Sequence, residues 1–128
     1  MEPIFLTLAE VLEIHDLQLE AHGGIQGIRD KGLLESAVMM PQSSFGGEFL
    51  HKTLFEMSAA YAFHISENQP FLDGNKRTAL VSALVFLDVN GFIVIDEEMK
   101  LYDAMISIAK KQMNKSNLAQ LLENLTHK

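Results

Sequence analysis

The chain lacks cysteine, long hydrophobic runs and an excess of basic residues, and each absence excludes a class of protein. Without cysteine there is no disulfide framework and no thiolate metal site, so a metal would take oxygen or imidazole ligands, which favours a hard cation such as Mg²⁺. No apolar run approaches the roughly 18 to 20 residues needed to span a bilayer. Neither end resembles a signal peptide. We therefore expect a soluble, cytoplasmic protein with no membrane contact.

Acidic residues outnumber basic ones by 17 to 10, which gives a formal net charge of -7 at pH 7. Broad affinity for nucleic acid comes mostly from neutralising backbone phosphates with Lys and Arg, so this balance argues against direct nucleic-acid binding. A protein or nucleotide partner fits the composition better. Two of the basic residues, Lys76 and Arg77, stand together shortly after a glycine.

Length and hydrophobic periodicity predict one all-α domain spanning residues 1–128. The chain is 48% hydrophobic, which is enough for a single core. Thr7 and Thr53 each begin a capping-box signature, which marks a helix start. Together with apolar spacing and with proline and glycine stops, these signals predict about six helices. They are expected at residues 7–21, 33–40, 53–65 and 76–90, with one more capped by Asp96 and a last one capped by Ser116.

The remaining segments are predicted to be loops or short strands. Residues 42–48 are rich in small, flexible residues and are expected to form a mobile loop or hairpin, and residues 92–95 a short strand. In the helix after Asp96, helical spacing places Met99, Tyr102, Met105 and Ile108 or Ala109 inward. Four histidines are expected at the surface or in caps, namely His15, His22, His51 and His127.

A densely polar stretch lies between the two most apolar predicted helices. The first N–H groups of the helix that begins near Gly74 lack intrahelical partners and lie at the positive end of the helix dipole, where anions bind. Gly74 lets a phosphate approach the backbone, and Asn75 can add an amide donor. Lys76 and Arg77 supply positive charge. Asp73 offers an oxygen ligand for a Mg²⁺ ion that bridges the phosphates.

The same residues also have an ordinary structural interpretation. An Asp-Gly-Asn sequence before a helix is common in N-caps and turns, and a Lys-Arg pair in a first turn can simply be solvated. First turns favour acidic residues, however, and two cations there oppose the helix dipole unless an anion joins them. This conflict favours the phosphate-binding interpretation.

The polar stretch resembles the Fic motif, whose usual form is His-x-Phe-x-Asp/Glu-Gly/Ala-Asn-x-Arg. The matching positions are Phe71, Asp73, Gly74, Asn75 and Arg77. The Asn-Lys-Arg ending, the later Asn90-Gly91 pair and the upstream segment at residues 24–37 are similar to the Doc (death-on-curing) branch in particular. The resemblance covers nearly the whole chain.

The resemblance implies an all-α Fic fold, a compact bundle with a small loop or hairpin flap, that binds ATP and Mg²⁺ at the motif. The implied assignments are a core anchor at Phe71, a Mg²⁺ ligand at Asp73, an anion hole at Gly74 and Asn75, and catalytic, phosphate-holding cations at Lys76 and Arg77. A lysine at position 76 is associated with Doc proteins that transfer the γ-phosphate to a hydroxyl. Fic proteins that transfer AMP usually have a small or different residue there.

The resemblance also implies partners. The implied substrate is a threonine of the elongation factor that delivers aminoacyl-tRNA, and its phosphorylation stops translation. The implied regulator is an antitoxin whose disordered tail folds onto the toxin. Restraint by an internal helix is not expected, because the loose match to that motif at residues 44–48 runs through two glycines. The loop at residues 43–49 resembles in position the family's target-binding flap.

Gln69 stands where the motif has a histidine, the family's general base. A glutamine amide cannot accept a proton near neutral pH, although it can orient a hydroxyl by hydrogen bonding. Losing a general base typically costs about 10²- to 10⁴-fold, whereas phosphoryl transfer depends mostly on positioning and charge. Two hypotheses stay open: a slowed transferase, and a nucleotide- and antitoxin-binding protein silenced at Gln69. His64, on the preceding helix, is a candidate replacement base whose simpler interpretation is a core or rim histidine.

Overall fold

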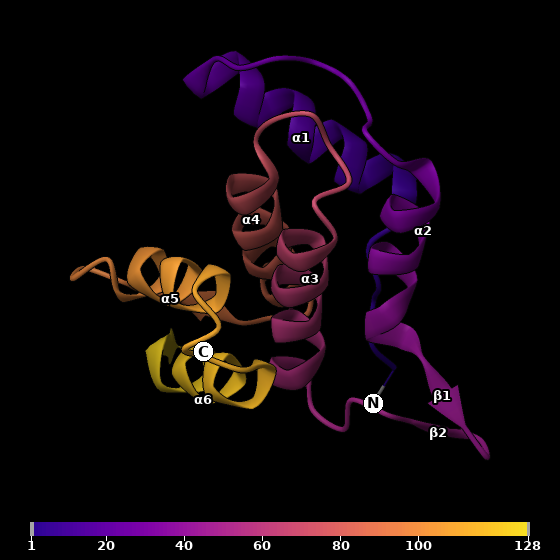
Figure 1. The fold of residues 1–128 in the computed structure, drawn as a ribbon. Coiled ribbons are helices and arrows are strands. Elements are labelled where there is room, and N and C mark those ends of the chain that lie inside the picture. The colour runs from indigo at the N-terminus through magenta and orange to yellow at the C-terminus, as the bar shows by residue number, and fades with distance from the viewer. Residues whose placement is uncertain (1, 128) are drawn as a thin grey trace.

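The computed structural model describes residues 2–127, which form a helical bundle with two small antiparallel strand pairs (Figure 1). Its helices are α1 (Leu8–His22), α2 (Lys31–Met39), the short 3₁₀ helix η1 (Met40–Gln42), α3 (Leu54–Asn68), α4 (Asn75–Val89), α5 (Lys100–Ala109) and α6 (Lys115–Leu125). Its strands are β1 (Ser44–Phe45), β2 (Glu48–Phe49), β3 (Ile93–Val94) and β4 (Thr126–His127). The predicted all-α class is confirmed. Within residues 2–127, no helix is both long and apolar enough to cross a lipid bilayer.

Helices α3 and α4 lie side by side at the centre of the bundle (Figure 1). Helix α1 crosses one end of the pair, α2 flanks one side, and α5 with α6 flanks the other (Figure 1). Small side chains let the two central backbones approach closely, and the Ser58 hydroxyl donates a 2.8 Å hydrogen bond to the Ala83 carbonyl. The fully buried alanines of the pair are Ala59, Ala60, Ala62, Ala79 and Ala83. The motif loop therefore joins the two most buried helices.

The capping residues predicted for α1 and α3 are confirmed. Thr7 Oγ1 accepts a 3.1 Å hydrogen bond from the Glu10 N–H, while Glu10 Oε1 accepts a 2.8 Å bond from the Thr7 N–H. Thr53 Oγ1 caps α3 by accepting a 3.1 Å bond from the Glu56 N–H, but the Glu56 carboxylate accepts from the Lys52 N–H, so the reciprocal half of the predicted capping box is absent. The start predicted for the last helix is wrong. Its cap is Asn114, whose side chain accepts from the Asn117 N–H at 2.8 Å, so Ser116 lies inside the first turn.

Helix α5 begins later than predicted, and this changes which side chains face the core. Asp96 does accept two 2.8 Å hydrogen bonds from the first N–H groups of α5, but Met99 is in the left-handed conformation and is not helical. The buried face of α5 is Leu101, Ala104, Met105 and Ile108. The inward positions of Met105 and Ile108 are confirmed. Those of Met99 and Tyr102 are wrong, because 63% and 59% of these residues' surfaces are exposed.

The sequence predicts both strands of one strand pair but only one strand of the other. Strands β1 and β2 form the expected hairpin, with Ser44 opposite Phe49 and Phe45 opposite Glu48. Its turn is two glycines at φ 60° and 83°, a backbone conformation that favours glycine. Strand β3 lies within the predicted strand, but its partner β4 at the C-terminus was not predicted, because their pairing joins segments far apart in the sequence.

Tyr61 ties the N-terminal segment to the central helices. Its hydroxyl oxygen accepts a 2.8 Å hydrogen bond from the Leu6 N–H, and both residues are buried. Burial raises the pKa of Tyr61 from 10.0 to about 12. The favourable contribution of the neutral phenol is therefore fully present below pH 10 and is lost as the pH rises from 10 toward 12.

We expect Tyr61→Phe to lower the free energy of unfolding by about 1 to 3 kcal/mol, because it leaves the buried Leu6 N–H without a partner. Urea unfolding at neutral pH and across pH 9–12 measures the effect. The variant should also lose part of the alkaline fall in stability that the parent shows. Tyr102→Phe, which removes the same hydroxyl from an exposed site, is the matched control and should change little. Equal stability of Tyr61→Phe and the parent would contradict the assignment.

Candidate functional site

The loop between α3 and α4, residues 69–74, turns the chain sharply at both of its ends. Gln69 follows α3 in the left-handed conformation with φ 45°, and its N–H donates to the Ile65 carbonyl at 3.2 Å. Gly74 precedes α4 with φ 78°, a conformation that glycine adopts at no steric cost. Residues that carry a side chain seldom adopt this left-handed backbone conformation. We therefore infer that contacts with the surroundings maintain it at Gln69.

The segment at residues 24–30 forms hydrogen bonds with this loop. The Arg29 N–H donates to the Pro70 carbonyl at 2.7 Å, and the Leu72 N–H donates to the Gly27 carbonyl at 3.0 Å. The Arg29 side chain also donates to the carbonyls of Asn68 and Gln69, at 2.7 and 2.6 Å. Its positive charge thereby caps the negative end of α3. The upstream segment that resembles the Doc branch is therefore part of the same site as the motif.

Two side chains, one at the end of the loop and one at the start of α4, form hydrogen bonds with the loop backbone. Asn75 forms two hydrogen bonds with the backbone of Phe71, accepting from its N–H at 2.9 Å and donating to its carbonyl at 3.0 Å. The Asp73 carboxylate accepts from the Gly74 N–H at 2.9 Å and from the Ile25 N–H at 3.2 Å. No side chain caps α4. The first N–H groups of α4 therefore remain available as anion donors, while the Asn75 amide is already engaged in closing the loop.

His15 of α1 contacts the loop at Phe71 and Asp73, and the only signal of this contact in the sequence is the position of His15 on the apolar face of α1. Only 3% of His15 is exposed, its ring stacks on Phe71 with centroids 3.7 Å apart, and its Nε2 lies 2.8 Å from the Asp73 carbonyl oxygen. A carbonyl oxygen only accepts, so Nε2 carries the proton and donates. The expectation of a surface or cap residue at His15 is wrong, and Nε2 cannot act as a general base.

A cavity of about 610 Å³ opens beside the loop, within the size range of small-molecule sites. It lies between the loop, the start of α4 and helix α5. The residues predicted for the site that line it are Gln69, Asp73, Gly74, Asn75, Lys76 and Arg77. Phe71 lies behind the loop and is 1% exposed. The structure thus brings the hydrophilic motif residues to one cavity wall and puts the motif aromatic in the core.

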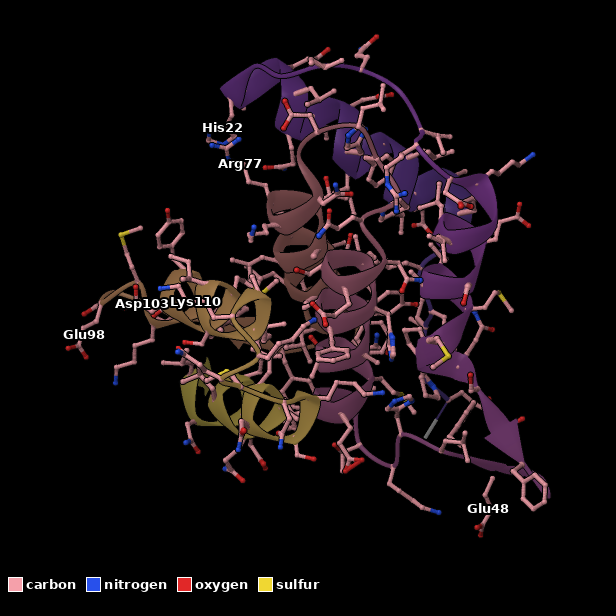
Figure 2. The ribbon with its side chains drawn as sticks, viewed as in Figure 1. His22, Glu48, Arg77, Glu98, Asp103 and Lys110 are labelled. Carbon is pink, nitrogen blue, oxygen red and sulfur yellow. The ribbon has the colours of Figure 1, made fainter. Side chains whose placement is uncertain are left out.

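The positive charges of this cavity are unbalanced. Lys76 and Arg77 are exposed, and neither side chain forms a hydrogen bond or ion pair with any group that the structure describes. Arg77 projects from the start of α4 on the side of the bundle where α5 lies (Figure 2). The third cation that lines the cavity, Lys111, is instead paired with Glu67. Two free cations beside an uncapped helix N-terminus create a local positive potential in an otherwise acidic chain.

His64 cannot serve as the base in this cavity. Among the side chains that the structure describes, no histidine lines it. His64 Nε2 lies 2.9 Å from Lys115 Nζ, and His51 Nε2 lies 3.0 Å from the same atom. Burial, followed by the positive charge of Lys115, lowers the pKa of His64 to about 4. The histidine is neutral at pH 7, but it belongs to the junction between α3 and α6.

We expect His15→Phe to lower the free energy of unfolding by about 1 kcal/mol, because the ring contact with Phe71 survives and the hydrogen bond to Asp73 does not. His15→Ala should cost about 2 to 4 kcal/mol, since it also leaves a cavity beneath the loop. Urea unfolding measures both changes. His22→Ala, at the exposed end of α1, is the control and should be near neutral. If all three variants had the stability of the parent, His15 would not support the loop.

Comparison with known proteins agrees with this geometry. A model described as the Fic/DOC family matches residues 5–87. The chain is 35% identical over 116 residues to "Protein kinase doc" of Escherichia phage P1, covering 91% of this chain and 90% of that protein. It is 41% identical over 71 residues to "Toxin Doc" of Mycolicibacterium smegmatis, covering 56% of this chain and 55% of that protein. The chain therefore belongs to the Fic/DOC family, and within it to the Doc branch.

Proposed function

We propose that the protein is a Doc-type toxin of a type II toxin–antitoxin module, which binds ATP with Mg²⁺ in the cavity beside residues 69–74 and transfers the γ-phosphate to a protein hydroxyl. The observation that carries the proposal is the pair of unpaired cations, Lys76 and Arg77, beside the uncapped N-terminus of α4. Backbone N–H groups at a helix start and flexible or forked cations are the groups that bind phosphates in proteins. The nucleotide would enter with its phosphates at this end of the cavity.

Asp73 fits the requirements of a Mg²⁺ site that is completed by phosphate. Its carboxylate is exposed in the cavity, and each of its oxygens accepts one hydrogen bond, which leaves lone pairs free. Among the described side chains there is no cluster of three histidine, aspartate or glutamate residues that could hold a metal alone. Mg²⁺ commonly takes one or two carboxylates together with substrate phosphates and water. It would neutralise charge that develops on the phosphates.

Gln69 lines the cavity next to Asp73 and would contact the acceptor hydroxyl. In the proposed transfer, the hydroxyl oxygen forms a bond to the γ-phosphorus, and the bond from that phosphorus to the β–γ bridging oxygen breaks. Gln69 cannot take the hydroxyl proton, so the proton passes to water or to a phosphate oxygen. The transition state is loose, and the cations and helix N–H groups supply its main stabilisation. Slow transfer is the expected consequence.

The proposed acceptor is a Ser or Thr of a translation elongation factor in the cytoplasm. The β1–β2 hairpin projects from the bundle, but it leads into the start of α3, at the opposite end of that helix from the motif loop, so it does not fit the expected target-binding flap (Figure 1). The proposed regulator is an antitoxin with a disordered tail that folds on binding. The name of the phage relative, "Protein kinase doc", and the lysine at position 76 support transfer of phosphate over transfer of AMP.

Gln69 also supports a second candidate function, a nucleotide- and antitoxin-binding protein that has lost turnover. The two candidates share the same phosphate site and differ only in chemistry. They are separated by incubating the protein in a bacterial extract with ATP labelled at the γ position and, separately, at the α position.

We expect the unmodified protein to transfer γ label to protein slowly, and Gln69→His to transfer it about 10²- to 10⁴-fold faster because it regains a general base. Arg77→Ala is the negative control in both backgrounds. Label transferred only by Gln69→His would support the silent binding protein. Transfer of α label in place of γ label would contradict the kinase proposal and support AMP transfer.

Removal of either free cation should weaken binding of Mg-ATP. For Lys76→Ala and Arg77→Ala we expect about 10- to 100-fold higher dissociation constants, because each loses a charge-assisted hydrogen bond to phosphate. Titration calorimetry measures the change. Lys110→Ala removes an equal charge at the end of α5, outside the cavity lining, and should bind like the parent. Equal losses in all three variants would mean that only net charge matters, and would contradict a defined phosphate site.

A further inference from the structure

Tyr102 on α5 is a large aromatic side chain that does not pack into the core of the bundle. Helix α5 buries one face on the core, and Tyr102 lies off that face with 59% of its surface exposed. No aromatic contact or hydrogen bond joins its side chain to any group that the structure describes. An exposed tyrosine needs no explanation by itself. Its position in the wall of the cavity beside residues 69–74 does need an explanation.

The cavity receives free cations from one helix and an exposed aromatic ring from another. Lys76 and Arg77 line it from the first turn of α4, and Tyr102 and Ala109 line it from α5. Tyr102 and Ala109 lie two helical turns apart and so share one face of α5. Arg77, Asp103 of α5 and Lys110, which follows α5, lie on the same side of the bundle (Figure 2). A ligand that contacts both the cations and the ring carries a polyanion and a flat aromatic group.

We propose that Tyr102 is the platform on which the base of a bound nucleoside triphosphate stacks, while its phosphates occupy the N-terminus of α4. This inference rests on the proposed function, because it takes the phosphate end of the cavity as given. A phenol ring exposed in a cavity wall presents an apolar face of low conformational entropy to a base. Stacking is tolerant of base identity, so Tyr102 sets a preference for nucleotides over simple polyphosphates and adds little discrimination among the bases.

The ring, and not the hydroxyl, is the part of Tyr102 that this arrangement requires. Tyr102→Phe keeps the ring and removes the hydroxyl, whereas Tyr102→Ala removes both. The two substitutions separate stacking from hydrogen bonding to the ribose or base. Because Tyr102 is exposed and makes no core contact, neither change is expected to disturb folding.

The test compares Mg-ATP with magnesium tripolyphosphate, which has the phosphates and lacks the base, as ligands in titration calorimetry. We expect Tyr102→Ala to weaken ATP binding about 5- to 100-fold and to leave tripolyphosphate binding unchanged, while Tyr102→Phe binds both like the parent. Lys76→Ala should weaken both ligands. Equal effects of Tyr102→Ala on both ligands, or an effect on neither, would overturn the proposal for Tyr102.

A second measurement reports stacking directly. The chain contains no tryptophan, so Tyr102→Trp introduces a single indole into the cavity wall. We expect its fluorescence to fall on addition of ATP and not on addition of tripolyphosphate. Unchanged fluorescence under conditions where calorimetry shows ATP bound would count against stacking.

The failure of this inference differs from failure of the proposed function. If Tyr102→Ala binds ATP as the parent does while Lys76→Ala does not, the phosphate site would be supported and stacking of the base on Tyr102 would be refuted. If the parent binds neither ATP nor tripolyphosphate, the proposed function falls and the base platform falls with it.

Discussion

The polar side chains of Asp73 and Asn75 bond to the loop and its neighbours and leave the first N–H groups inside α4 uncapped, and the arrangement of the site depends on this. A side chain near a helix start usually caps the N–H groups of its own helix. Here Asn75 turns back to the backbone of Phe71, and Asp73 bonds to the N–H groups of Gly74 and Ile25. The N–H groups at the start of α4 are left without a capping side chain, and their positive field points into the cavity.

Maintaining the loop in this form requires contributions from distant parts of the chain. Residues 24–30 pair with its backbone, and His15 supports it through Phe71 and the Asp73 carbonyl. Position 24 favours glycine because its φ is 130°, a conformation that residues with a side chain rarely adopt. A Cβ there would lie 2.8 Å from a methyl carbon of Leu19 and 2.9 Å from a carboxylate oxygen of Asp73. The upstream glycines and the motif are therefore one structural unit.

The site has groups suited to binding phosphate, but it lacks a group suited to accepting a proton. The groups suited to phosphate, Lys76, Arg77 and the start of α4, are all present and unpaired in the described structure. The group suited to taking a proton is missing, because Gln69 replaces the histidine of the motif and His15 faces the loop through a protonated nitrogen. Since phosphoryl transfer relies more on positioning and charge than on a base, this division is compatible with slow catalysis as well as with binding alone.

The sequence by itself determined the helix class, the starts of α1 and α3, the hairpin and the set of polar residues at the loop. These features depend on local signals, namely capping residues, apolar spacing, paired glycines and a motif that is contiguous in the chain. It did not determine that His15 lies beneath the loop, that Asn75 closes it, that β4 pairs with β3, or that Tyr102 lines the cavity with its ring exposed. Only the tertiary structure decided these points. His15, β4 and Tyr102 depend on contacts, or on a helix phase, set by segments far apart in the sequence. The Asn75 bonds span only four residues, but an Asn at a helix start can equally cap its own helix, and the loop that it closes is held by residues 24–30.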